Sequence, residues 1–337
     1  MAERFHFLYN TVEPQVRNLN IGGHVTAVRS RDPNLLATFI SPFVHLLRDD
    51  QGSSPAQSPA ITIDIALRED LVDPSNPLWP WDLDRYQDDL GIIQFDSNLD
   101  LIFALNVLTH HAILIFDTLL ETQWIRPEYS RPIIERIFSH YGMASVHGGT
   151  LGLDGRCVLI TAKGGSGKSS LITAGVTRGL QTIGDDFQFL GQSPNNWEPL
   201  QLWSLYHSVK LDTESPAWNY LGLSPQENPP LSGMDKSLVN LLDVYPDRVV
   251  VRQQPMAIVV PTLGTTGGLE SISVEETLTA LLPTSVGMST RKRESVLALM
   301  NLVESLPCYS LTVTRNLDLA IDEVTNLLNS HSELLNR

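Results

Sequence analysis

A glycine-rich loop between an apolar run and a helical segment is the feature that most constrains this chain. The loop runs from Ala162 to Ser169 and reads AKGGSGKS, which is Ala, four residues of any kind, then Gly-Lys-Ser. The run CVLIT before it predicts a buried strand, and KSSLITAGVTRG after it predicts a helix that Gly179 closes. Glycines let a backbone aim several N–H groups at one anion, and a helix adds its positive N-terminal end. The segment therefore predicts the phosphate site of a nucleotide-binding domain.

The motif also predicts roles for individual side chains. Lys168 is expected to contact the β- and γ-phosphates, and the hydroxyl of Ser169 is expected to ligate Mg²⁺. The predicted ligands are therefore ATP and Mg²⁺. The predicted ATP-binding residues are Lys163, Gly164, Gly165, Ser166, Gly167, Lys168, Ser169 and Ser170.

An acidic pair, Asp185 and Asp186 in the stretch IGDD, follows the predicted helix. A strand that returns from so short a helix can end beside the phosphates. Two adjacent carboxylates can divide the work of phosphoryl transfer, since one can accept the proton of an attacking hydroxyl while the other holds a metal ion. An acidic pair in a turn is ordinarily a solvated loop, but the spacing after the glycine loop favours a functional pair.

Three further side chains are candidates for the same site. His147, in SVHGG, lies one predicted hairpin before the loop, and an imidazole titrates near neutral pH, which suits proton transfer or phosphate contact. Lys210 and Arg252 occupy strand-like positions downstream and could contact the γ-phosphate. For each of these two cations, the sequence favours the alternative of a surface charge whose stem packs on apolar neighbours.

The charge balance excludes one class of partner. The net charge is −15, and the basic triplet RKR at 291–293 is the nearest approach to a cluster of cations. Because nucleic-acid binding depends on clustered Lys and Arg, no nucleic-acid partner is expected.

Membrane insertion and secretion are not expected either. The apolar segment 101–120 is interrupted by Asn106, His110, His111 and Asp117, and we expect a buried amphipathic helix there. Two cysteines far apart, without metal-ligand spacing, are typical of reduced thiols, and the N-terminus resembles no signal peptide. A cytoplasmic protein is therefore expected.

The order of the predicted elements suggests two domains in the 337 residues. Residues 1–140 form an N-terminal α+β region that could recognise the substrate. Residues 141–337 contain the hairpin with its Asp154-Gly155 turn, the glycine loop and the later strands and helices, and they are expected to form the ATP-binding catalytic domain.

The stretch 146–190, VHGGTLGLDGRCVLITAKGGSGKSSLITAGVTRGLQTIGDDFQFL, resembles the HPr kinase/phosphorylase family and its HPr-kinase-like relatives. Those proteins carry a histidine-glycine, a strand, a P-loop, a helix ending in Arg-Gly and an Asp-Asp pair in this order. The resemblance implies an α/β fold in which an N-terminal α+β region precedes a P-loop kinase domain. That domain would be similar to the nucleotide-binding core of HPr kinase and phosphoenolpyruvate carboxykinase.

The resemblance implies that Asp185 is the general base, Asp186 the magnesium-associated aspartate and His147 the active-site histidine. The chain departs from HPr kinase at Ser170, where that family has an acidic residue, and it lacks the family's C-terminal signature. These departures argue against HPr as the substrate and against phosphorylase activity. Relatives with this looser pattern phosphorylate a serine of a peptide precursor or free serine, so the expected acceptor is a hydroxyl of a peptide, protein or small molecule. The resemblance also allows a homo-oligomer.

Two other functions fit the glycine loop. A P-loop ATPase or switch would release phosphate to water, but LQTIGDD makes a poor Walker B strand because Gln181, Thr182 and Gly184 interrupt its apolar run. A nucleotide-binding regulator without turnover would not need Lys168 together with both aspartates. The sequence therefore favours a kinase over both alternatives.

Overall fold

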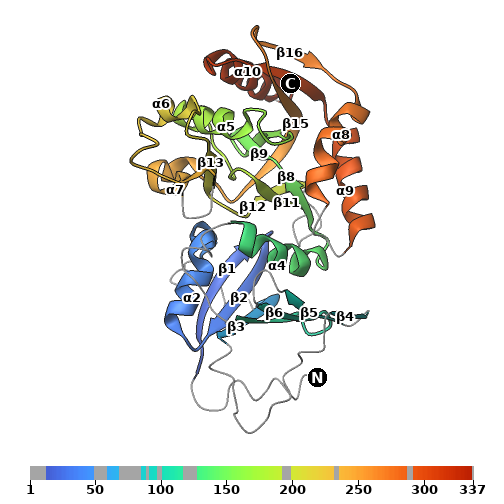
Figure 1. The fold of residues 1–337 in the computed structure, drawn as a ribbon. Helices are drawn as coiled ribbons and strands as arrows, with labels where there is room; N and C mark the ends of the chain where they lie inside the picture. The colour runs from blue at the N-terminus through green and yellow to red at the C-terminus, as the bar shows by residue number, and fades with distance from the viewer. Residues whose placement is uncertain are drawn as a thin grey trace. The chain divides into compact units, whose positions relative to one another are not determined.

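The structure is a computed structural model that describes residues 13–48, 59–67, 85–88, 91–96, 101–116, 127–191, 199–230, 235–286 and 291–335. The chain divides into two compact units, Met1–Ile137 and Phe138–Arg337, which are described one at a time (Figure 1). Both units combine helices with sheets, so the protein is mixed α/β. Among the described helices, none is both long enough and apolar enough to cross a bilayer.

Unit 1 contains a seven-stranded sheet in the order β1-β2-β3-β7-β6-β5-β4. The helix α2 (Pro33–Ile40) follows β2 and begins at Asp32, whose carboxylate caps the amides of Asn34 and Leu35. The strands are β1 (Gln15–Ile21), β2 (His24–Ser30), β3 (Ile61–Leu67), β4 (Arg85–Asp88), β5 (Gly91–Asp96), β6 (Leu101–Asn106) and β7 (His111–Phe116), and the remaining helices are η2 (Ser41–Leu46) and α4 (Pro127–Ser139), which crosses the boundary between the units.

The prediction of a helix over residues 101–120 is wrong for the described part of that segment. Residues 101–116 form an antiparallel hairpin in which Leu101 pairs with Phe116 and Asn106 pairs with His111. The Asn106 side chain accepts the amides of Leu108 and Thr109, at 3.0 and 3.1 Å, and so closes the turn. A short, nearly continuous apolar run fits a buried strand as well as a buried helix, so periodicity could not decide between them.

Unit 2 is built on an eight-stranded sheet that branches at its longest strand, β15. Beyond one edge of β15 lie β17 and β16, while the other edge pairs with β12 near the start of the strand and with β10 further along. The strands of this sheet are β8 (Ala144–His147), β9 (Gly149–Leu153), β10 (Arg156–Ile160), β11 (Phe187–Gly191), β12 (Gln201–Ser204), β15 (Arg252–Leu263), β16 (Gly268–Ser271) and β17 (Cys308–Val313). A separate two-stranded sheet joins β13 (Ser208–Leu211) to β14 (Ser237–Asn240).

Helices cover both faces of this sheet, because its central strands are apolar on both sides. In β10, Val158 and Ile160 join the cluster that includes residues of α5 and α10, whereas Cys157 and Leu159 join the cluster that includes residues of α8 and α9. Burial raises the pKa of the Cys157 thiol. The helices are α5 (Lys168–Thr177), α6 (Ala217–Leu221), α7 (Leu241–Val244), η4 (Pro246–Arg248), α8 (Val274–Ser285), α9 (Lys292–Ser305) and α10 (Asp318–Leu335).

Local chemistry sets the elements that surround the glycine loop. Asp154 (φ 50°) and Gly155 (φ 79°) form the tight turn between β9 and β10, as their sequence predicts. The helix α5 ends before Gly179, whose φ of 100° suits glycine at a helix C-terminus. Within LQTIGDDFQFLG only the second half forms a strand, β11, whereas Gln181 and Thr182 form isolated bridges before it.

Candidate active site

The glycine loop begins where β10, a central strand of unit 2, ends. The strand lies between β9, which is antiparallel to it, and β15, which is parallel to it. Both Gly165 (φ 83°) and Gly167 (φ 89°) adopt the left-handed conformation that other residues rarely take, and α5 starts at the next residue, Lys168. The backbone path of the loop therefore depends on its glycines.

The polar groups of this loop are available to an anion. Among the described residues, none accepts a hydrogen bond from a backbone N–H of residues 163–169, and the first such donor in α5 is Leu171, which bonds the carbonyl of Gly167 at 2.9 Å. The Ser166 Oγ is buried without a hydrogen-bond partner among the described groups. Groups of this kind fit the oxygens of a phosphate, which accepts hydrogen bonds and favours the positive end of a helix.

The acidic segment, residues 183–186, is held against β9 and the residue before it by backbone and side-chain bonds. The amide of Ile183 donates to Thr150 Oγ1 at 3.0 Å, and the amide of Gly148 donates to the carbonyl of Asp186 at 3.0 Å. At Gly184 (φ 114°) a Cβ atom would lie 2.0 Å from the carbonyl oxygen of Tyr206, so only glycine fits. Asp186 itself adopts a positive φ of 78°, which is uncommon for a residue with a side chain.

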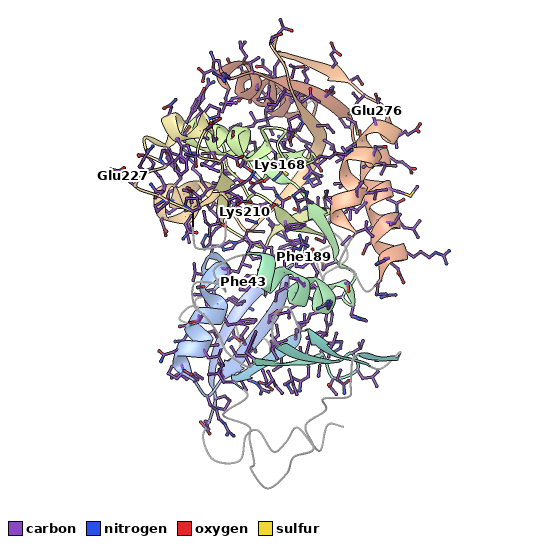
Figure 2. All side chains as sticks on the ribbon, viewed as in Figure 1. Phe43, Lys168, Phe189, Lys210, Glu227 and Glu276 are labelled. Carbon is purple, nitrogen blue, oxygen red and sulfur yellow. The ribbon has the colours of Figure 1, made fainter. Side chains whose placement is uncertain are left out.

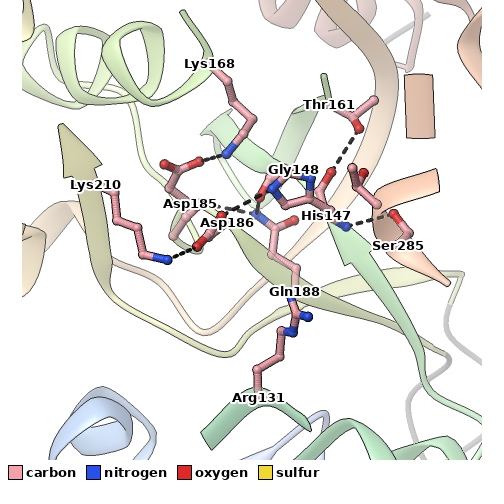
Figure 3. A network of polar contacts seen from close by, with 12 residues as sticks. Arg131, His147, Gly148, Thr161, Lys168, Asp185, Asp186, Gln188, Lys210 and Ser285 are labelled. Atoms are coloured by element: carbon pink, nitrogen blue, oxygen red, sulfur yellow. Dashed lines mark hydrogen bonds and ion pairs between the residues drawn. The ribbon is translucent and has the colours of Figure 1, made fainter. Parts of the chain in front are cut away.

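The two aspartates have separate cationic partners (Figure 3). Lys168 Nζ, from the first turn of α5, donates to Asp185 Oδ1. Lys210 Nζ, from β13, donates to Asp186 Oδ2 at 2.7 Å, and His147 Nε2 lies 3.2 Å from Asp186 Oδ1. In Figure 2 both lysines lie within unit 2, whereas Glu276 lies on the outer side of α8. The glycine loop, the acidic segment and β13 therefore contribute to one network of charges.

Burial and charge set the protonation state of Asp186. Burial by itself would raise its pKa, but the hydrogen bond with His147 and the positive charges of Lys210 and Lys168 outweigh this effect. The pKa of Asp186 is therefore held well below its ordinary value, and the side chain is a carboxylate at neutral pH. Asp185 is more deeply enclosed, with 2 % of its side chain exposed against 20 % for Asp186.

His147 is fixed at both its backbone and its ring. Its amide donates to Ser285 Oγ at 2.9 Å, at the end of α8, and its carbonyl accepts from Thr161 Oγ1 at 2.9 Å, just before the glycine loop. The ring stacks on Phe187 with 4.8 Å between centroids. These contacts orient the imidazole toward Asp186 and connect its position to the loop and to α8.

The structure brings most of the predicted site residues together. Lys168, Asp185, Asp186 and His147 form the network, and Lys210 joins it as an interior partner of Asp186 instead of the surface cation that the sequence favours. Of the remaining loop residues, Lys163, Gly164 and Gly165 are exposed, Ser169 is half-buried in the first turn of α5, and Ser170 Oγ bonds Ser215 Oγ at 2.7 Å.

Arg252 does not belong to the site, which corrects its tentative assignment as a phosphate contact. The register of β10 and β15 places Arg156 opposite Gln254 and Ile160 opposite Val259. Arg252 precedes this paired stretch, so it lies toward the start of β10, while the glycine loop follows the end of that strand. Its guanidinium lies over the Trp203 ring, 5.5 Å from the centroid, where it makes a cation–π contact.

Sequence reasoning missed two residues that position His147. Ser285 lies 138 residues after His147 in the chain, and no motif connects them. Thr161 adjoins the loop, and its position directly before Ala162 is a signal that could have drawn attention to it. Within the described part of the chain, no group of three His, Cys, Asp or Glu side chains could hold a metal ion.

Comparisons with solved structures give a distant likeness. No family model matches this chain, and no curated protein matches it. Among solved structures, the chain is similar to the Hpr(Ser) kinase/phosphatase from Coxiella burnetii, with 17% sequence identity and a TM-score of 0.31. The match covers 56% of this chain and 98% of that one. A likeness this distant carries no inference about function.

Proposed function

We propose that this protein is a kinase that binds ATP with Mg²⁺ and transfers the γ-phosphate to a hydroxyl group. The observation that carries the proposal is the joining of the glycine loop to the acidic pair through Lys168 and Asp185. A loop with available N–H groups can hold a chain of phosphates, and a carboxylate beside it can take a proton from an attacking hydroxyl.

The residues present fit a nucleotide with its metal ion. The amides of the loop and the buried Ser166 Oγ would bond phosphate oxygens, and Lys168 would neutralise part of their charge. Ser169 and the carboxylate of Asp186 would hold Mg²⁺, which usually binds one or two protein oxygens together with substrate phosphates. When bound, Mg²⁺ supplies positive charge to the transferring phosphoryl group.

Two aspartates with different surroundings suit two different tasks. Asp186 is kept ionised by His147 and Lys210, so it is a weak base and a suitable partner for a cation. Asp185 has Lys168 as its cation, and Lys168 can turn from this carboxylate toward phosphate when a nucleotide binds. We therefore assign the role of general base to Asp185. His147 and Lys210 hold Asp186 in place.

The acceptor is proposed as a class. A hydroxyl of a peptide, a protein or a small molecule such as serine agrees with the chemistry of a carboxylate base. Because the chain carries a net charge of −15, long-range attraction favours a neutral or cationic acceptor.

The enclosure of Asp185 favours a second candidate function. With 2 % of its side chain exposed, this carboxylate is reached more easily by water than by a large acceptor. A P-loop ATPase or switch that acts on a partner without a phospho-acceptor would use the same residues. The two candidates differ in where the phosphate goes.

A phosphotransfer assay separates them. Purified protein would be incubated with Mg²⁺ and γ-labelled ATP, with and without serine-containing peptides of neutral and basic composition and with free serine. We expect label on the acceptor hydroxyl, and a loss of about 100-fold or more in Asp185→Asn. Asp154→Asn is a matched control, because the same substitution is made in the exposed turn at the opposite end of β10.

Steady phosphate release with no labelled acceptor would favour the ATPase. Equal transfer by the wild type and by Asp185→Asn would exclude Asp185 as the base. Absence of ATP binding would overturn the proposed function as a whole.

A further inference from the structure

Two exposed leucines of unit 2 lie on either side of the turn that follows β15, and the first of them contacts the glycine loop. Leu263 ends β15 and is 66% exposed, and Leu319 lies in the first turn of α10 and is 58% exposed. Single large apolar side chains exposed to water are common. Two of them near a proposed ligand site indicate a surface that contacts the ligand.

Leu263 lies against the glycine loop, and Leu319 lies against the turn that follows Leu263. A Cβ atom placed on Gly167 would lie 3.4 Å from Leu263 Cδ2 and 3.6 Å from Val313 Cγ1. Leu263 and Val313 are themselves opposite one another in the pairing of β15 with β17. A Cβ atom placed on Gly267 would lie 3.7 Å from Leu319 Cβ, and Gly267 belongs to the turn that follows Leu263. We call Leu263, Val313 and Leu319 the leucine shelf.

The shelf and the acidic pair lie on opposite sides of the loop. The loop follows β10, which has β9 on one side and β15, then β17, on the other. On the β9 side, a Cβ atom placed on Gly149 would lie 3.0 Å from Asp185 Oδ1. Leu263 and Val313 stand at the ends of β15 and β17, and Leu319 lies at the start of α10, which Figure 1 draws together with β15 and β16 in this part of unit 2. A phosphate chain held by the loop, with its last phosphate toward Asp185, would therefore direct the rest of the nucleotide toward the shelf.

We propose that the leucine shelf is the subsite for the nucleoside of the nucleotide, where the faces of the base or the ribose pack on Leu263 and Leu319. The inference rests on the proposed function and adds to it the place of the nucleoside. A nucleobase has apolar faces, and binding it here removes apolar surface of both leucines from water. The shelf contributes to affinity for the nucleoside, while the loop contributes to affinity for the phosphates.

Calorimetric titration of the full chain with two probes tests the proposal. The probes are ATP and inorganic tripolyphosphate, each with Mg²⁺, since tripolyphosphate carries the phosphate chain without the nucleoside. We expect Leu263→Ser and Leu319→Ser each to weaken ATP binding on the order of tenfold and to leave tripolyphosphate binding unchanged. Leu297→Ser, at an exposed leucine of α9 (49% exposed), is the matched control and should change neither affinity.

The possible outcomes distinguish a failure of the nucleoside subsite from a failure of the proposed kinase function. If wild-type protein binds ATP and the shelf variants keep the same ratio of ATP to tripolyphosphate affinity, the shelf does not hold the nucleoside and the kinase proposal stands. If both affinities fall together, the leucines act by shaping the loop and the inference is overturned. If wild-type protein binds neither probe, both proposals fall. Circular dichroism of each variant verifies that it is folded, which is expected because both leucines are exposed.

Discussion

The ion pair between Lys210 and Asp186 can be measured with little disturbance of its surroundings. Lys210→Met removes the charge and keeps an apolar stem of similar length. Asp186→Asn removes the opposite charge, and asparagine tolerates the left-handed conformation (φ 78°) that this position requires. The two single variants and the double variant form a double-mutant cycle, which isolates the interaction between the two side chains.

The magnitude follows from distance and burial. Two unit charges 2.7 Å apart attract by about 6 kcal/mol at an effective dielectric constant of about 20. Loss of hydration opposes this attraction, because only 18 % and 20 % of the two side chains are exposed. His147 also shares the carboxylate, so part of the stabilisation remains when Lys210 is removed. We expect a coupling free energy of about 2 kcal/mol at pH 7.

Urea unfolding of the full chain, followed by tryptophan fluorescence, gives the four free energies of unfolding. The slope with urea concentration must agree among the four proteins for the comparison to hold. The pKa of Asp186 is lower in the folded than in the unfolded chain, so its ionised form stabilises the fold above the ordinary value of 3.8. The coupling should therefore be constant from about pH 8 to about pH 5 and should decline only below about pH 4, as the pH falls toward the folded pKa.

A second ion pair of the same residue types is the control. Lys236 and Asp212 are 3.0 Å apart, but 38% and 60% of their side chains are exposed. Their coupling should be below about 1 kcal/mol. A coupling for Lys210 and Asp186 as small as that of the control pair would refute the reasoning, because it would mean that burial does not strengthen this contact.

Two further predictions concern the acidic segment and the corrected assignment. Gly184→Ala should lower the free energy of unfolding by about 3 kcal/mol or more, because it combines a positive φ with a Cβ atom 2.0 Å from the carbonyl of Tyr206. Gly222→Ala (φ 64°) meets no atom within 4 Å, so urea unfolding should show a loss of only about 1 kcal/mol, and equal losses would mean that the close contact is relieved. Arg252→Met should change the rate of phosphotransfer less than about twofold, and a loss comparable to that of Asp185→Asn would return Arg252 to the site.

Local patterns predicted the elements around the loop because their signals lie within a few residues. The Asp154-Gly155 turn and the helix closed at Gly179 depend on backbone conformations that these residues favour. The prediction for the segment 101–116 was wrong because its signal is not local. Its apolar residues fit a strand or a helix equally, and the choice depended on pairing with the neighbouring β5 and with β3, which is distant in the sequence.

For the site, the closeness of Lys168 and Asp185 could be anticipated from the short helix between them. The surroundings of Asp186 could not be anticipated from the sequence. Lys210 approaches it from β13, and Ser285 fixes His147 from α8, through contacts that span 24 and 138 residues. The sequence also could not separate Lys210 from Arg252, since both are cations in strand-like runs, and only the strand register placed one inside the network and the other over Trp203.

The sequence by itself determined the parts of this protein whose chemistry is local. These are the glycine loop, whose backbone angles require glycine, the helix that follows it, and the presence of two adjacent carboxylates a short distance later. Tertiary structure decided which charges face those carboxylates and where the exposed leucines lie. The physical reason is that strand pairing and helix packing bring together residues far apart in the chain, and the pKa of Asp186 depends on those neighbours.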